Sequence, residues 1–197
     1  MARKNKGTRS QKKLIYIIGE GITEQYYFQH LKRIKGYTCI IKPRLFGNTS
    51  IFHFEKKIDE LISDAEIICV FDADVSRRNP AESERLQNLK NKYIDNDRVL
   101  ICDSLQCFEY WFILHYEDIC PAHNNASETV KRLKMHIPDY SKSEQYLKKP
   151  QWVEVMNVDD NLSNARERAK RHEEGASYTR VYKAINRLEK TSASCGL

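Results

Sequence analysis

The feature that most constrains the fold of this chain is the alternation of short apolar runs with longer amphipathic stretches. Four runs have the length and β-branched content of buried strands, at 14–19, 38–42, 66–71 and 98–102. Helical periodicity separates them over 23–35, 50–63 and 81–93. This alternation predicts an α/β fold with a parallel sheet, right-handed crossovers and helices on both faces.

After the fourth strand the pattern becomes mainly helical. An aromatic-rich helix is expected over 105–116, followed by helices near 126–136, 141–149, 161–173 and 178–190. In the first helix, Thr23 is the expected N-cap and Gly36 the expected end. We therefore expect a basic flexible arm (1–13), an α/β core (14–118) and a helical, basic C-terminal region (119–197).

Charge is distributed unevenly along the chain. The formal net charge is +6, and residues 1–13 hold six bases and no acid. Residues 55–74 hold seven acids against two bases, whereas residues 131–149 hold six bases against two acids. An acidic centre flanked by basic segments suits a metal site towards which a polyanion is steered, although solubilising surface charge explains the helical part equally well.

We expect neither a membrane-spanning segment nor a signal peptide. No apolar run approaches the ~20 residues that span a bilayer, and no apolar segment of signal-peptide length follows the basic N-terminus. The six cysteines are scattered and contain no CxxC pair, so we read them as reduced structural residues. These observations predict a cytoplasmic protein without a membrane segment.

Two acidic motifs follow predicted strands. Glu20 and Glu24 lie on the turn that leaves the first strand and enters the first helix, and Asp72 and Asp74 follow the third strand. The carboxyl ends of parallel strands open on the ligand-binding edge of such sheets. Oxygen ligands of this kind favour Mg²⁺ or Mn²⁺ over zinc. We therefore expect a divalent metal site there, against the alternative in which Glu24 only caps its helix and Glu20 faces solvent.

Further polar residues lie in apolar surroundings. Glu109 falls within the most apolar stretch of the chain, and an unpaired buried carboxylate is costly, so it should face a cation, a donor or the cleft. The alternatives are an exposed helix face or a structural salt bridge. Asp103 and Ser104 end the fourth strand and reach the same edge, while His115 fits a satisfied core histidine better than a base.

The motifs resemble a known family. A strand-ending Glu20 followed by Asp72-x-Asp74 is similar to the Toprim pattern. More closely, GEGITEQYYF (19–28), FDAD (71–74) and CFEYWFILHY (107–116) resemble the RloB-like family of bacterial defence proteins. The likeness spans 14–190 and includes Asn164-Ala165 and the segment Thr179–Tyr182. One departure is Gln106, where this family is expected to have proline before the cysteine.

The resemblance implies a Toprim-like sheet, metal-dependent phosphodiester chemistry and phage defence beside an AAA-type or ABC-type ATPase. By this analogy, Glu20 is a ligand or general acid/base, and Asp72 and Asp74 hold metal. Glu24 is carried over from the nuclease branch of Toprim proteins. The expected catalytic residues are Glu20, Asp72 and Glu109, and the expected cofactor is Mg²⁺ or Mn²⁺.

The leading hypothesis is a nuclease or phosphodiesterase acting on DNA or RNA. Its expected phosphate-binding residues are Arg77, Arg78, Lys131, Arg132 and Lys134. One rival is a non-catalytic nucleic-acid-binding adaptor of a defence ATPase. Another is a haloacid-dehalogenase-like phosphatase, in which Asp72 is phosphorylated and Asp159-Asp160 supplies the late acidic pair. The oligomeric state stays open, a homodimer included.

Overall fold

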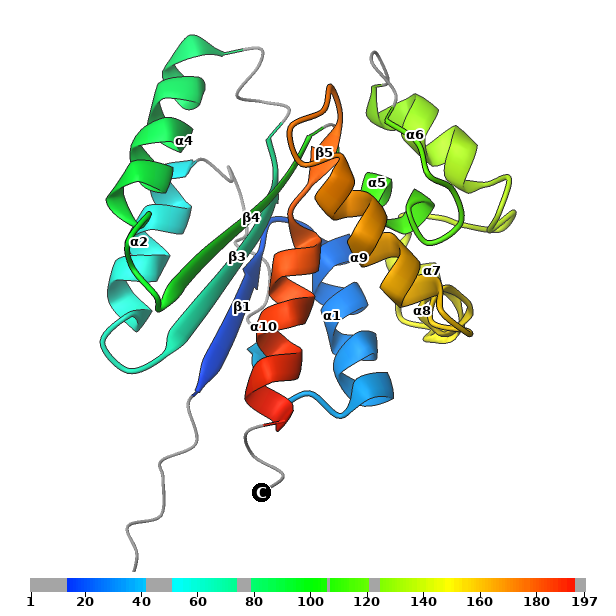
Figure 1. The fold of residues 1–197 in the computed structure, drawn as a ribbon, viewed down its shortest axis with the longest axis horizontal. Helices are drawn as coiled ribbons and strands as arrows, with labels where there is room; N and C mark the ends of the chain where they lie inside the picture. The colour runs from blue at the N-terminus through cyan, green and yellow to red at the C-terminus, as the bar shows by residue number, and fades with distance from the viewer. Residues whose placement is uncertain (1–13, 42–50, 74–78, 106, 121–124, 194–197) are drawn as a thin grey trace, which may run out of the picture.

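In a computed structural model of the chain, the described residues are 14–41, 51–73, 79–105, 107–120 and 125–193. They form an α/β fold in which helices cover both faces of a five-stranded, mostly parallel sheet (Figure 1), so the expected class is confirmed. The elements are β1 (Ile15–Gly19), α1 (Ile22–Lys35), β2 (Ile40–Ile41), α2 (Ile51–Leu61), β3 (Glu66–Asp72), α4 (Pro80–Lys92), β4 (Val99–Leu105), α5 (Glu109–Ile113), α6 (Ala126–Leu133), α7 (Glu144–Leu147), α8 (Gln151–Met156), α9 (Asn161–Arg171), β5 (Tyr178–Thr179) and α10 (Val181–Ala193).

The strand order places three strand ends side by side. The order is β2-β1-β3-β4-β5, with β5 antiparallel to β4 and the other neighbours parallel. Gly19 of β1 pairs with Val70 of β3, and Asp72 of β3 pairs with Ser104 of β4. The carboxyl ends of β1, β3 and β4 are therefore adjacent, as expected for the ligand-binding edge of an open α/β sheet.

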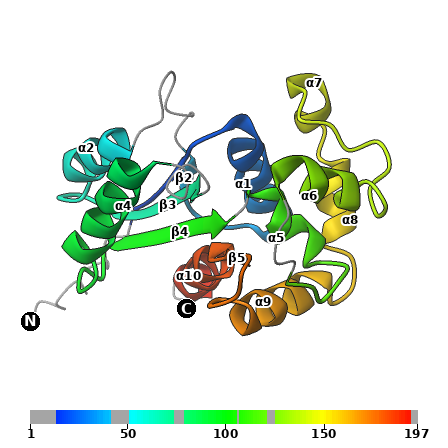
Figure 2. The same ribbon diagram turned by 90° about the horizontal axis from the view of Figure 1, so that it is seen from above.

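The interior of strand β3, residues 67–71, is continuously apolar, as expected for a strand whose two faces are both covered. Side chains alternate across a strand, so Ile67, Cys69 and Phe71 share a cluster with α2 and α4. Ile68 and Val70 belong to the larger cluster, which includes α1, α5 and α10. Figure 2 shows these two helical layers from above. By the same alternation, Asp72 is directed towards the α1 and α5 side.

The first helix confirms one expected end and corrects the other. Gly36 ends α1 in the left-handed conformation, at φ 70, and its N–H bonds to Lys32 O. The expected N-cap at Thr23 is wrong, because the N-cap is Gly21, whose backbone is extended and which makes no side-chain cap bond. Thr23 lies one residue inside the helix and is 6% exposed.

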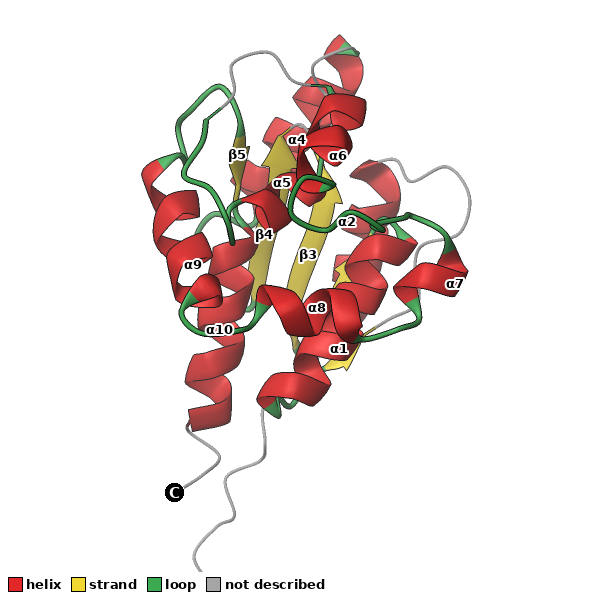
Figure 3. Cartoon of the chain, turned by 90° about the vertical axis from the view of Figure 1, so that its right-hand side faces the viewer, coloured by secondary structure: helices red, strands yellow, loops and turns green. Residues whose placement is uncertain are grey.

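The C-terminal region returns to the sheet. The helix expected over 105–116 is shorter, because β4 continues through Leu105, where Ser104 and Leu105 pair with Thr179 and Tyr178 of β5. For the same reason the last helix begins only at Val181. Helix α10 packs against β4, the short helices α7 and α8 contact α1, and α6 packs against α5 (Figure 3). The division at residue 118 stays a prediction, and the larger hydrophobic cluster extends across it.

Candidate functional site

Glu20 joins the ends of two neighbouring strands. It follows Gly19 directly, and its backbone N–H donates to Val70 O at 3.2 Å. Its side chain reaches β3, where Oε2 accepts the Asp72 N–H at 3.0 Å. The turn after β1 is therefore held against the end of β3, so the carboxyl of Glu20 lies beside the backbone of Asp72.

Glu24 is buried in the first turn of α1, with 5% of its surface exposed. It fits there because Gly21 has no side chain: a Cβ at this position would lie 2.7 Å from Glu24 Oε2. Burial raises the pKa of Glu24 to about 8, and the nearby charges of Glu109 and Glu20 add to this rise. The carboxyl therefore keeps its proton at neutral pH while no cation is bound.

Asp72 ends β3 among the same acids. Burial raises its pKa well above the usual range, and the charges of Glu24, Glu109 and Glu20 contribute in that order. Its Oδ1 is buried and accepts no hydrogen bond from any described residue. Because a buried polar atom without a partner is costly, this oxygen is an available ligand for a cation.

Glu109 begins α5 and is 1% exposed. Its Oε1 accepts a hydrogen bond from the Tyr140 hydroxyl at 2.9 Å and faces Lys142 Nζ at 2.8 Å. The Tyr140 hydroxyl is also hydrogen-bonded to the side chain of Thr23. Glu109 Oε2 is buried and has no partner among the described residues. The acid thus faces both a cation and a donor, and one oxygen remains unused.

These side chains form what we call the carboxylate cluster, namely Glu20, Glu24, Asp72 and Glu109. An all-oxygen set with two unsatisfied buried atoms fits a hard divalent cation such as Mg²⁺ or Mn²⁺. Within the described ranges, no three His, Cys, Asp or Glu side chains are arranged so that they could hold a metal ion. The expected ligand Asp74 lies outside these ranges.

The expected phosphate-binding residues have different positions. Arg77 and Arg78 lie outside the described residues. Lys131 on α6 and Lys134, the C-cap of that helix, are exposed, whereas Arg132 forms an ion pair with Glu117. The ion pair with Arg132 lowers the pKa of Glu117, and the hydrogen bond with His136 lowers it further. Lys131 and Lys134 are therefore open to solvent, and Arg132 is engaged in a structural contact.

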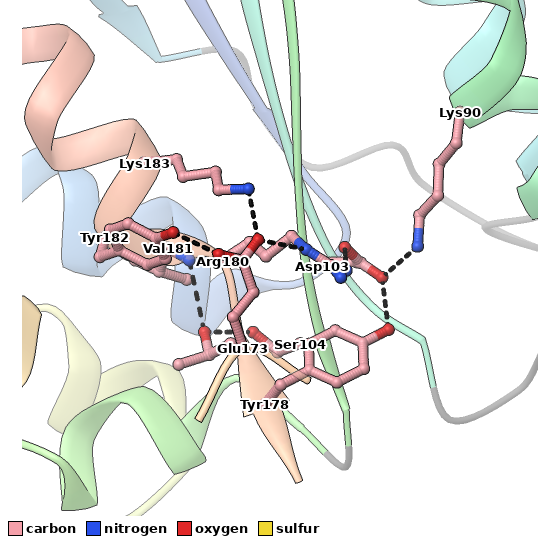
Figure 4. A network of polar contacts seen from close by, with 10 residues as sticks. Lys90, Asp103, Ser104, Glu173, Tyr178, Arg180, Val181, Tyr182 and Lys183 are labelled. Carbon is pink, nitrogen blue, oxygen red and sulfur yellow. Dashed lines mark hydrogen bonds and ion pairs between the residues drawn. The ribbon is translucent and has the colours of Figure 1, made fainter. Parts of the chain in front are cut away.

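Asp103 and Ser104 serve a different network, shown in Figure 4. Asp103 is fully buried, although nearby bases lower its pKa against the effect of burial. Its oxygens contact Lys90 Nζ at 2.7 Å, Arg180 Nη1 at 2.6 Å and the Tyr178 hydroxyl at 2.8 Å. Ser104 Oγ bonds to Thr179 Oγ1 at 2.8 Å. These contacts fasten β5 and the start of α10 to β4.

His115 has the surroundings of a core residue. It is 1% exposed, and its Nδ1 lies 3.0 Å from Trp111 O. Burial lowers its pKa to about 4. The ring is therefore neutral at physiological pH and packs edge-on against Trp111, which agrees with a structural role.

The sequence did not predict two residues of the site, Tyr140 and Lys142. Both lie between α6 and α7, about thirty residues beyond Glu109, in a segment that the sequence marks only as basic. The available signal was the cost of burying Glu109, which requires a donor or cation from elsewhere in the chain. No pattern of spacing identifies which lysine supplies it.

Comparison with known proteins identifies one family. The family model described as RloB-like protein matches residues 15–188, nearly the whole chain. Neither the curated proteins nor the solved structures contain a match. In the described part of the chain, every helix is too short or too polar to cross a membrane.

Proposed function

The chain belongs to the RloB-like family, and from this membership together with the carboxylate cluster we propose that it is a metal-dependent nuclease or phosphodiesterase acting on nucleic acid. The observation that carries the proposal is the pair of buried carboxylate oxygens without partners, Asp72 Oδ1 and Glu109 Oε2. Functional sites commonly retain such costly groups, because a ligand satisfies them on binding.

The residues of the site have distinct roles in this proposal. Glu24, Asp72 and Asp74 hold Mg²⁺ or Mn²⁺ together with Glu20, whose position is set by its bond to the Asp72 N–H. The bound ion supplies Lewis-acid stabilisation of the phosphate and a more acidic water. Glu24 carries a proton in the metal-free protein and releases it when the site is loaded. Glu109 is the fourth member of the cluster and adds to its negative charge.

The remaining assignments rest on family likeness and charge. A Toprim-like sheet, a role in phage defence and an AAA-type or ABC-type ATPase partner follow from the RloB-like resemblance. Exposed Lys131 and Lys134 and the basic segment 1–13 provide positive charge for a phosphate backbone without reading its sequence. The chain acts in the cytoplasm in this proposal, on either DNA or RNA.

Cleavage by the purified protein tests the proposal. Labelled single- and double-stranded DNA and RNA are incubated with Mn²⁺ or Mg²⁺, and parallel samples contain EDTA. We expect metal-dependent cleavage that Glu20→Gln abolishes, because Glu20 is the acid that joins the two strand ends. Glu84→Gln, an exposed acid of α4, is the matched control and should retain activity.

The rivals give different results in the same preparation. An adaptor binds nucleic acid without cleaving it under any metal condition, and Glu20→Gln then leaves phage defence intact. Both outcomes together would refute the nuclease proposal. A phosphatase instead forms an aspartyl phosphate at Asp72, which mass spectrometry after acid quenching would detect.

A further inference from the structure

The carboxylate cluster has a basic side chain of its own, Lys142. Its Nζ lies 2.8 Å from Glu109 Oε1, while half of its side chain is exposed. Lys142 also acts electrostatically on Glu24 and Asp72, where its charge opposes the rise of both pKa values. Burial lowers the pKa of Lys142, but the charge and hydrogen bond of Glu109, together with Cys107 and Asp72, outweigh this and raise it, so the amine stays protonated.

The backbone around Lys142 is anchored on both sides. Tyr140 is fully buried two residues before it, and Leu147 is fully buried five residues after it. Between them, Ser143 is the N-cap of α7 and accepts the Tyr146 N–H. The start of the lysine side chain is therefore held at the edge of the cluster, while its half-exposed end is free to change partners.

Glu109 uses its two oxygens differently. Both Tyr140 and Lys142 contact Oε1, and Oε2 has no partner among the described residues. Tyr140 keeps Oε1 hydrogen-bonded if the lysine leaves, and the Cys107 side chain is also hydrogen-bonded to the Glu109 carboxyl. The ammonium is thus a removable contact on an otherwise fixed carboxyl, which distinguishes it from the hydroxyl.

We propose that Lys142 is a substrate-positioning residue, which neutralises the carboxylate cluster in the metal-free protein and moves to a phosphate oxygen of the nucleic acid when a divalent ion binds. The inference rests on the proposed function. A divalent cation in the cluster takes over neutralisation of the carboxylates and repels the ammonium. The phosphate backbone then offers the lysine its next negative partner, as a charge-assisted contact.

Metal affinity without nucleic acid provides the first test. Lys142→Met removes a competing positive charge, so Mn²⁺ should bind about tenfold more tightly, measured by calorimetry or by the electron paramagnetic resonance of free Mn²⁺. The matched control is Lys148→Met, which removes an equal charge from an exposed side chain paired with Glu144 on α7. It should bind Mn²⁺ like the wild type.

Nucleic-acid affinity provides the second test and should change in the opposite direction. With Ca²⁺ in place of Mn²⁺ to slow turnover, Lys142→Met should bind a labelled single-stranded oligonucleotide about tenfold more weakly, and Lys142→Arg should restore most of the affinity. Unchanged or weaker Mn²⁺ binding by Lys142→Met, or unchanged oligonucleotide binding, would show that Lys142 is only a structural partner of Glu109.

Two further controls separate the possible failures. If the wild type binds no Mn²⁺, the proposed function fails together with this inference. If it binds Mn²⁺ but the lysine variants behave like the wild type, only the inference fails. Should Lys142→Met unfold, reductive ¹³C-methylation of the wild type replaces it: the Lys142 resonance, assigned by its absence in Lys142→Arg, must shift on addition of Mg²⁺ and again with oligonucleotide.

Discussion

Replacing the ionisable carboxyl of Glu24 by a neutral amide should stabilise the metal-free protein. The side chain is 5% exposed and its pKa is raised from 4.5 to about 8 by burial and by neighbouring acids. Glu24→Gln keeps the size and one acceptor oxygen but carries no charge. The variant therefore removes the cost of a buried acid and little else.

The magnitude follows from linkage between protonation and folding. As the pH rises above 4.5, the unfolded chain releases the Glu24 proton, whereas the folded chain keeps it until about pH 8. Rising pH therefore favours the unfolded wild type, at 1.36 kcal/mol for each pH unit. At pH 7 the accumulated cost is about 3 kcal/mol, and near pH 4.5 it is close to zero.

Urea unfolding in EDTA measures this difference. We expect Glu24→Gln to exceed the wild type by about 3 kcal/mol at pH 7, or roughly 6–12 °C in melting temperature, with the gap closing near pH 4.5. The exposed control Glu84→Gln should stay within about 0.5 kcal/mol. Saturating Mn²⁺ should stabilise the wild type far more than Glu24→Gln.

Equal or lower stability of Glu24→Gln in EDTA at pH 7 would refute the reasoning. It would show that the folded protein compensates the charge of Glu24, so that the carboxylate cluster is a balanced structural network. A stabilising substitution that also removes the response to Mn²⁺ is the expected signature of a site whose acids are retained for binding.

Other parts of the chain give further predictions. Asp103→Asn should lower the free energy of unfolding by about 3 kcal/mol in urea titrations, because two buried ion pairs lose the charge of their shared carboxylate. An unchanged response to Mn²⁺ would confirm that this network is separate from the carboxylate cluster. Gly21→Ala should weaken Mn²⁺ binding about tenfold in calorimetry, since its Cβ would lie 2.7 Å from Glu24 Oε2; wild-type affinity would contradict the required close approach. Because burial lowers the pKa of His115 from 6.5 to about 4, acidification through this window favours the unfolded chain by up to about 3 kcal/mol. His115→Gln should lack that part of the pH dependence, and an identical slope would contradict the assignment.

Local chemistry explains which elements the sequence predicted. The strand predicted at 66–71 contains the apolar run 67–71, a pattern typical of a strand covered on both faces, and it appears as β3 with one additional residue. Gly36 ends α1 because the left-handed conformation favours glycine there. Such features depend on neighbouring residues in the chain, so a reader of the sequence can find them.

Other boundaries depend on contacts between distant segments. Leu105 and Tyr178 extend β4 and form β5 by pairing with each other, although both segments have helical patterns. Thr23 has the chemistry of an N-cap, but its side chain bonds to Tyr140. In each case a partner more than seventy residues away overrides the local preference.

The sequence by itself determined the α/β class and the positions of Glu20 and Asp72 at strand ends, because strand-forming runs and the turns after them are local patterns. Only the tertiary structure decided which side chains surround the buried acids of the site and offset their charge. In the folded chain, Glu109 lies beside these acids. Of the lysines in the basic segment, Lys142 is the one that pairs with Glu109. The physical reason is that a buried charge requires a partner in space, while the sequence records only the order of the residues.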